Sequence, residues 1–559
     1  MHTMYIDDQT YSVDGRTYRR ILLRNSYRKD GKICHDTVAN LSLCSDEEIR
    51  AMKYALSHKH DLSNIEKKAG GEAAQEEYEQ GLSFGAVWVL FQLAKRYGIV
   101  ETLGNSEDGK RVLWMIIATL IGSVSRLSIT RLAKSHAACD ILGLNSFCED
   151  DLYESLDWLE KQQKRIEQRL FKIHYQDKVP SLFLYDVTSS YFEGVCNELA
   201  EHGYNRDGKK GKKQIVIGLL TDEDGRPIAC EVFKGNTQDP KTFQSQLQKL
   251  CSRFSIKTAT LVGDRGMIKT AQIKEITSEH FHYITAITKP QIQKMLTEGS
   301  LQYELFDETV TEIDLKNLRY ILKRNPVRVQ EIRESRNSKY QKLEEVCLKK
   351  NLYLQEHARA QVEIAKKKLE AKASQLKIDS WITLHVKGKK LILKKDPEKL
   401  KKESLLDGCY VIKTDLPKDD FSKDFIHDRY KSLAEVEWAF RTMKTVLLHL
   451  RGIFVRKANR TRGHVFVMML AYLIAFELRR LWESLEITVE EGIQELTQLC
   501  TLKKKIQNIS IQIIPAPREN IKKLFEKANV MLPDAIPDRN IPVYTRKKLV
   551  EERRTHLNK

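Results

Sequence analysis

Residues 181–289 contain strand-like and helix-like segments in an order that few folds accommodate. Three strand-like segments come first, separated by turn signals such as TDEDGRP: SLFLYDVTSSYF, KKQIVIGLL and RPIACEVFKG. A helical segment (PKTFQSQLQKLCSRF), the strand-like TATLVGDRG, a helix from about residue 268 and the strand-like HYITAITK follow. The order β-β-β-α-β-α-β predicts a three-stranded meander that α/β crossovers extend into a larger sheet.

This is the order expected of an RNase H-like core, an α/β fold with a mixed sheet in which the first and fourth strands are neighbours. Asp186 lies in the middle of the first strand and Asp264 ends the fourth, so the two carboxylates are expected to face each other. A carboxylate on a buried strand is costly unless its charge is compensated. Two close carboxylates repel unless a divalent cation bridges them, and Mg²⁺ suits such a pair. Asp186 is therefore either a satisfied structural acid or part of a cation site.

A third acid is expected from a helix packed against the same edge. Ser432 and Glu435 have the spacing of a capping box, which predicts a helix start. Glu437, Arg441 and Lys444 follow at i, i+4 and i+7 on one face, where an acid could hold a metal and two cations a phosphate backbone. The alternative is an exposed i,i+4 salt bridge, which is common and contributes little. The adjoining core-facing stripe consists of Leu433, Val436, Phe440, Met443 and Leu447.

Shifts in pattern along the chain predict several regions. Residues around a KDGK turn alternate as in β-hairpins, and a mostly polar, charged segment (residues 337–377) predicts one long helix that interrupts the core. The strand-like LRYILKRN and WITLHVKGKKLILKK flank that helix. The predicted regions are 1–65 (β-rich), 66–175 (helical, for DNA binding or dimerisation), 176–299 (core, first part), 300–407 (insertion), 408–482 (core, second part) and 483–559 (basic C-terminal region).

The charge balance favours a polyanionic partner. The chain has 94 Lys and Arg against 76 Asp and Glu, a net charge of +18, and nucleic acid is the commonest partner of such proteins, although solubility alone is an alternative. The ten cysteines include no C-x-x-C pair, which favours a reducing cytosol. No signal peptide is evident, and apolar runs such as VFVMMLAYLIAF are too short to span a bilayer. We therefore expect a cytoplasmic protein without a membrane partner.

Several motifs in one order carry a family resemblance: YDVTSSYFEG, GYNRDGKKGKKQIVIGLL, FKGNTQD, LVGDRGM and Y-x2-L-x3-E-x6-K. Together with SYRKDGKICHDTVANL and RTRGHVFVMMLAYLIAFEL near the ends, they resemble the IS4-type DDE transposases, in particular the IS1634 group. The resemblance places the catalytic, metal-binding triad on Asp186, Asp264 and Glu437. It implies two Mg²⁺ ions in each active site, with Mn²⁺ as a substitute.

The same resemblance places the family's Y-R-E-K signature on Tyr430, Leu433, Glu437 and Lys444. Leu433 departs from the pattern, because the family usually has arginine there, and Arg429 or Arg441 could make the missing phosphate contact. The implied activity is cutting of double-stranded DNA at the terminal repeats of an insertion sequence and joining of the 3′-OH ends to target DNA. A homodimer in a synaptic complex on the prokaryotic nucleoid would do this.

Other DNA contacts are weaker predictions. Arg265 follows the second aspartate and could reach a phosphate or pair with a nearby acid. Trp438 could stack on an extruded base, although packing is the commoner role. A basic loop with one aromatic could follow a DNA backbone or be a solvated hairpin; its members are Tyr204, Arg206, Lys209, Lys210, Lys212 and Lys213.

Two alternative functions are compatible with the same residues. A metal-dependent nuclease with this core would cut DNA without end specificity and without joining. A non-catalytic DNA-binding protein derived from a transposase would keep the basic surface and lose the chemistry.

Overall fold

The computed structural model forms two compact units. The first contains Met1–Gly81, Cys500–Pro515 and Pro533–Asp538, and the second contains Leu82–Leu499, Ala516–Leu532 and Arg539–Lys559. The structure describes residues 3–13, 16–29, 32–57, 77–122, 125–194, 196–209, 211–278, 280–450, 452–506 and 509–546.

The first unit contains two sheets. Strands β1 (Thr3–Val13), β2 (Arg16–Lys29) and β3 (Lys32–Asn40) pair in that order, and helix α1 (Asp46–Ser57) helps to bury a small core around Ile21. The predicted hairpin is thus confirmed, while Asp30 and Gly31 of its turn lie outside the described residues. The second sheet, which the sequence pattern did not predict, has the order β17-β16-β15-β4. Its strands are Ala535–Ile536, Ile509–Ile513, Cys500–Ile506 and Glu77–Ser83.

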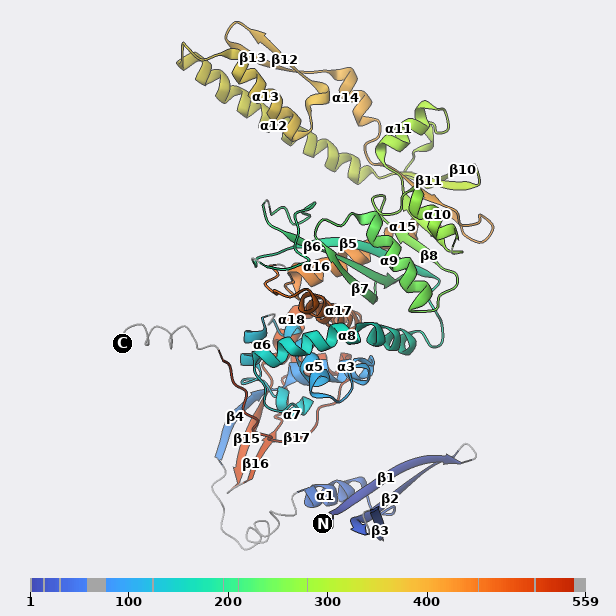
Figure 1. The fold of residues 1–559 in the computed structure, drawn as a ribbon, viewed down its shortest axis with the longest axis vertical. Helices are drawn as coiled ribbons and strands as arrows, with labels where there is room; N and C mark the ends of the chain where they lie inside the picture. Colours follow the sequence, from blue (N-terminus) through green and yellow to red (C-terminus); the bar gives the residue numbers. More distant parts are fainter. Residues whose placement is uncertain are drawn as a thin grey trace. The chain divides into compact units, whose positions relative to one another are not determined.

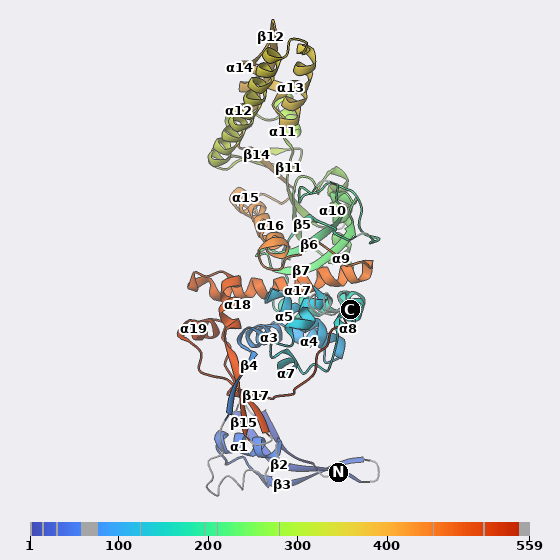
Figure 2. The ribbon, with the colours of Figure 1, turned by 90° about the vertical axis from the view of Figure 1, so that its left-hand side faces the viewer.

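Helices dominate the start of the second unit, within the region 66–175 that the sequence predicted to be helical. Helix α17 (Ala458–Trp482), which contains the apolar run VFVMMLAYLIAF, packs against α5, α8 and strand β7 (Figure 2). Most of its residues are buried, and along the described ranges no helix is long and apolar enough to cross a membrane. The other helices here are α3 (Gly85–Arg96), α4 (Ile99–Leu103), α5 (Glu107–Leu120), α6 (Arg126–Leu132), α7 (Ala138–Leu142) and α8 (Glu149–His174).

The contact between α17 and α8 leaves no room for a side chain at Gly463. A Cβ atom there would lie 2.4 Å from the carbonyl oxygen of Leu156 on α8. We expect Gly463→Val to lower the free energy of unfolding by about 2 kcal/mol or more, because two packed backbones would have to separate. Ala371→Val, on an exposed position of helix α13, is the matched control. Denaturant unfolding measures both variants, and equal losses would contradict this packing.

The second unit is built on an eight-stranded mixed sheet of order β10-β11-β14-β9-β8-β5-β6-β7 (Figure 1). Strands β5 (Leu182–Tyr191), β6 (Gln214–Asp222) and β7 (Pro227–Lys234) form the expected antiparallel meander. After helix α9 (Asp239–Ser252), β8 (Thr260–Gly263) pairs in parallel with β5, which confirms that the first and fourth strands are neighbours. Helix α10 (Thr270–Ser278) leads to β9 (His282–Ala286), which pairs in parallel with β8.

Three antiparallel strands extend this sheet beyond β9. These are β14 (Cys409–Thr414), β11 (Leu318–Arg324) and β10 (Thr311–Leu315). The strand-like LRYILKRN was expected beside the long polar helix and outside the main sheet. This prediction is wrong, because the segment forms β11 of the main sheet. Helix α11 (Lys289–Thr297) and a 3₁₀ turn (η1, Tyr303–Leu305) connect β9 to β10.

The residues between β11 and β14 have a hydrophobic core of their own, around Leu343, Leu369 and Trp381. The single long helix predicted here is wrong: the chain forms α12 (Pro326–Glu356) and α13 (Val362–Leu376), which pack against each other. Burial of Leu343 and Leu354 against Leu369 decides this, since tertiary packing outweighs the helix propensity of a polar segment. The remaining elements are η2 (Asp379–Trp381), β12 (Ile382–Lys387), β13 (Lys390–Lys395) and α14 (Pro397–Ser404).

We name residues 326–407, which lie between the paired strands β11 and β14, the inserted segment, and both of its ends are fixed at one place. The Asn325 amide donates a hydrogen bond to the Gly408 carbonyl at 2.9 Å. The Arg336 guanidinium forms two hydrogen bonds to the buried carboxylate of Asp407, at 2.8 and 2.9 Å. The segment therefore leaves and re-enters the sheet between two hydrogen-bonded neighbouring strands.

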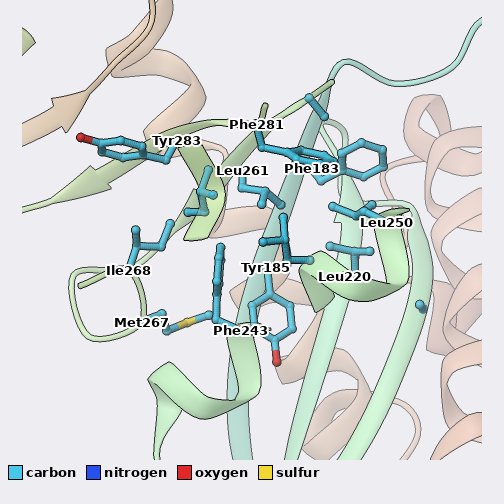
Figure 3. Close-up of a cluster of buried hydrophobic side chains, with 14 of the residues drawn as sticks. Phe183, Tyr185, Leu220, Phe243, Leu250, Leu261, Met267, Ile268, Phe281 and Tyr283 are labelled. Carbon is cyan, nitrogen blue, oxygen red and sulfur yellow. The ribbon is translucent and has the colours of Figure 1, made fainter. Parts of the chain in front are cut away.

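Apolar side chains fill one face of the main sheet. Phe183, Tyr185, Phe243 and Leu261 meet there in a buried cluster (Figure 3). Because side chains alternate along a strand, Asp186 points to the opposite face from its neighbour Tyr185. Helices α9 and α10 lie on one side of the sheet and α16 (Leu433–Arg441) on the other (Figure 2). The remaining helical elements are α15 (Lys423–Lys431), η3 (Thr442–Val446), η4 (Glu483–Leu485), α18 (Val489–Thr497) and α19 (Glu519–Lys527).

Candidate active site

Strands β5 and β8 bring Asp186 and Asp264 to the same level of the sheet. Tyr185 and Gly263 are partners in the parallel ladder, and Asp186 and Asp264 are the residues that directly follow them in the sequence. The Asp264 carboxylate accepts hydrogen bonds from the Arg265 amide at 2.7 Å and from the Tyr430 hydroxyl at 3.4 Å. Burial and the nearby Asp264 charge raise the pKa of Tyr430, so this phenol stays a donor.

The electrostatics of Asp186 link the three acids that the sequence singled out. Burial raises the pKa of Asp186 to about 7, and the negative charges of Asp264 and Glu437 add to the increase. The Val187 N–H and the Arg206 guanidinium act in the opposite direction without cancelling it. A cation beside Asp186 would therefore remove an electrostatic penalty that the folded chain carries.

Glu437 comes from helix α16, which packs on β5. The predicted stripe beside it is confirmed, because Leu433, Val436, Phe440, Met443 and Leu447 are all buried.

The predicted capping box at Ser432 is wrong. The Ser432 side chain donates to the Asp428 carbonyl at the end of α15 and accepts no helix-capping hydrogen bond. Ser432 is nevertheless the N-cap residue of α16, so the predicted helix start is confirmed. A side-chain cap is present at the start of α15, where the Ser422 hydroxyl accepts from the Phe425 amide at 3.1 Å. Glu435 instead pairs with Arg479 at 3.1 Å.

The three acids line one cleft of about 350 Å³. Tyr430 and Leu433 of the predicted signature line it too, so the leucine in place of arginine faces the cleft. The sequence analysis did not single out the remaining lining residues, Asn325, Tyr410, Lys431 and Ala434. Asn325 and Tyr410 are next to the ends of β11 and β14, and no local pattern shows that these strands join the sheet beside β9.

The oxygen ligands of this cleft suit a hard divalent cation. Among the described residues, no group of three or more His, Cys, Asp and Glu side chains lies close enough to hold a metal ion. Mg²⁺, however, is commonly bound through one or two carboxylates, with waters and substrate phosphates completing its shell. Asp186 and Asp264 on adjacent strands, with Glu437 in the same cleft, fit that mode of binding.

The predicted DNA-contact residues lie in varied surroundings. Arg265 and Arg441 are exposed, and so is Lys213 at the start of β6. Arg206 donates to both carboxylate oxygens of Asp239 at 2.7 Å. Lys210 of the basic loop lies outside the described residues, whereas Tyr204 of the same loop is exposed.

Trp438 is half-buried on α16. The Arg479 guanidinium lies 3.9 Å from the centre of its ring, and Tyr472 packs beside it. These contacts are those of a packing residue, which is the alternative to base stacking that the sequence allows for Trp438.

The sequence predicts that Lys444 lies on the same exposed face as Glu437, and this prediction is wrong. The Lys444 side chain is only 6% exposed and pairs with Asp207 at 2.6 Å. The reason is a π-helical turn over Thr442–Val446, which changes the helical register after Arg441.

Comparisons with known proteins agree with this architecture. A family model described as "Transposase DDE domain" matches residues 177–474, more than half of the 559-residue chain and all of the cleft. The chain therefore belongs to the DDE transposases. A second family model, "IS1634 family transposase, N-terminal domain", matches residues 8–71 and places it in the IS1634 group, so the resemblance seen in the motifs is confirmed.

Two further comparisons complete this picture. No curated protein sequence matches the chain. Among solved structures, a piggyBac transposase synaptic complex with hairpin DNA, determined by cryo-EM, is similar at 9% sequence identity and a TM-score of 0.37, with 70% of each chain covered.

Proposed function

We propose that this transposase cuts DNA at the ends of its own insertion sequence and joins the 3′-OH ends to target DNA by two-metal phosphoryl transfer. The observation that carries the proposal is the convergence of Asp186, Asp264 and Glu437, from two adjacent strands and a helix, on one cleft. We assign catalysis and metal binding to these acids. The strand order β7-β6-β5-β8-β9, with α16 packed on β5, supports an RNase H-like core as the scaffold.

The chain's own residues hold the acids in place. The Tyr430 hydroxyl and the Arg265 amide fix the Asp264 carboxylate, and the Arg206 guanidinium offsets part of the charge repulsion at Asp186. Each Mg²⁺, or Mn²⁺ in its place, would be held through one or two of the carboxylates of Asp186, Asp264 and Glu437 and would supply charge stabilisation for the attacking and leaving oxygens.

Double-stranded DNA is the proposed partner. Arg265, Arg441 and Lys213 are exposed cations that could contact phosphates of the element's terminal repeats or of the target. Tyr430 lines the cleft and Arg206 acts on the charge of Asp186, so these two residues would contact DNA only near the cleft. Trp438 would contact DNA only through the half of its side chain that is not packed. Joining requires two ends at once, so we propose a homodimer in the synaptic complex.

A cleavage and joining assay tests the proposal. The purified chain is given the DNA that flanks its own gene and a supercoiled target, with Mg²⁺ or with EDTA, beside Asp264→Asn. Metal-dependent cuts at a defined end, followed by joining and absent in the variant, are the expected result. Nicking without end preference would indicate a nuclease, and binding without cleavage would indicate a non-catalytic DNA-binding protein.

The inserted segment is expected to contribute much of the electrostatic affinity for DNA. Residues 326–404 contain 21 Lys and Arg against 11 Asp and Glu, a net charge of +10 out of +18 for the chain. Replacing four exposed lysines (Lys367, Lys368, Lys387 and Lys390) with glutamine should lower the slope of log K against log [salt] by about 0.9 for each lost phosphate contact. Arginine at the same four positions is the control and should keep the wild-type slope. An unchanged slope in the glutamine variant would show that this surface does not touch DNA.

A further inference from the structure

The helix that carries Glu437 changes its geometry before it reaches Lys444. Helix α16 ends at Arg441, and Thr442–Val446 forms a π-helical turn. In a continuous α-helix, residues 437 and 444 would lie two turns apart on one face. The wider turn separates them: Glu437 is exposed in the cleft, whereas the Lys444 side chain is 6% exposed.

The buried ammonium of Lys444 contacts two other segments. Its Nζ lies 2.6 Å from Oδ1 of Asp207 and donates to Oγ1 of Thr188 at 2.9 Å. The Asp207 side chain is only 1% exposed, and its other oxygen accepts a hydrogen bond from the Tyr191 amide at 3.2 Å. Both partners of the ion pair are therefore enclosed by protein.

Each of the three joined segments carries a residue of the cleft or of its surroundings. Thr188 is two residues after Asp186 on β5, so both side chains project from the same face of the sheet. Asp207 follows Arg206, whose charge offsets the repulsion at Asp186. Lys444 follows the helix of Glu437 by one turn. One buried cation thus links the helix and the strand that supply two of the three acids.

We infer that Lys444 is a positioning residue, which holds Glu437 in register with Asp186 through its ion pair with Asp207, and not a contact to DNA phosphate. The inference rests on the proposed catalytic role of these acids. A buried ion pair adds little net stability compared with a neutral pair of similar volume, but loss of one partner leaves an uncompensated charge. A positioning role of Lys444 should therefore survive when both charges of the ion pair are removed together, and fail when only one is removed.

A double-mutant cycle tests the inference. The variants are Lys444→Met, Asp207→Asn and the combination; asparagine keeps an acceptor for the Tyr191 amide. The measured quantities are the single-turnover rate of end cleavage in Mg²⁺, the affinity for end DNA in EDTA and the thermal unfolding midpoint. Lys444→Met alone is expected to lower the cleavage rate by about 100-fold, the order of loss that a misplacement of about 1 Å causes, while DNA affinity changes by less than about threefold.

Rescue distinguishes positioning from phosphate contact. The double variant is expected to cleave at least tenfold faster than Lys444→Met, because neither charge is then left unpaired. A phosphate contact at Lys444 would instead weaken DNA binding in both variants, and Asp207→Asn would restore nothing. A double variant that is inactive or unfolded overturns the inference.

Two controls keep the outcomes apart. Lys431→Met removes an exposed lysine that lines the cleft, and Asp207→Asn should not rescue it. Asp264→Asn tests the proposed function itself: if it still cleaves, the proposed function fails. If it is inactive and the double variant is not rescued, the positioning role of Lys444 alone fails.

Discussion

Replacing Asp186, Asp264 or Glu437 with its amide is expected to lower the rate of DNA end cleavage by about a thousand-fold or more, which corresponds to about 4 kcal/mol of transition-state stabilisation. Each substitution keeps the shape of the side chain and removes one negative charge from the cleft that all three residues line. DNA binding in EDTA should be retained or become tighter, because a negative charge that repels phosphate is lost. Single-turnover cleavage in Mg²⁺ measures the rate, and a filter or gel assay measures the affinity.

Glu435→Gln is the matched control for the three amide variants. Glu435 lies on the same helix as Glu437, but its carboxylate pairs with Arg479 and is not among the cleft residues. We expect this variant to cleave at a rate close to that of the wild type. An amide variant of the triad that keeps a tenth of the wild-type rate would remove that residue from the catalytic set.

The second large effect is on stability. Asp186→Asn is expected to raise the metal-free free energy of unfolding at pH 8 by about 2 to 4 kcal/mol, since burial raises the pKa of Asp186 from 3.8 to about 7 in the folded protein. The sign follows from proton binding. Between the unfolded pKa of 3.8 and the folded pKa of about 7, the folded state binds more protons, so this group's contribution to stability is present below about pH 4 and is lost as pH rises through 7.

Urea unfolding in EDTA at pH 5 and pH 8 checks this. The difference in unfolding free energy between Asp186→Asn and the wild type should be larger at pH 8. Asp177→Asn, at an exposed aspartate before β5, should show no such difference. Added Mg²⁺ should stabilise the wild type more than the variant, because a ligand of the folded state adds RT ln(1 + [L]/Kd). A pH-independent difference would contradict the buried, repelled carboxylate.

The sequence predicted those parts of the site that depend on strand order. Asp186 and Asp264 could be paired because an acid within one apolar run and an acid at the end of another fall on strands that the meander-and-crossover order makes neighbours. Glu437 had no comparable signal. Its helix is separated from β8 by more than 150 residues, and only the family motif distinguished it from a surface glutamate.

The wrong predictions have identifiable physical causes. Lys444 was placed on the face of Glu437 because an α-helical period was assumed, and a π turn leaves no repeating pattern in five residues. Ser432 has the right spacing for a capping box and does precede a helix, but it is also the C-cap residue of α15 and keeps a helical backbone conformation, so its hydroxyl bonds back to α15 and does not cap α16. LRYILKRN could not be assigned to the main sheet, because its pairing with β14 joins segments separated by the whole inserted segment.

The attachment of the inserted segment has a consequence for how such chains can diversify. Its two ends meet at Asn325 and Gly408, one hydrogen bond apart, with the Arg336–Asp407 pair beside them. For the eight-stranded sheet, the segment takes the place of a hairpin turn between β11 and β14, whatever the length of α12 and α13. Residues can therefore be gained or lost beyond Arg336, or the whole segment exchanged for another with adjacent ends, while β11, β14 and the cleft beside them keep their register. Its reach and charge can change in evolution, or by design, independently of the chemistry.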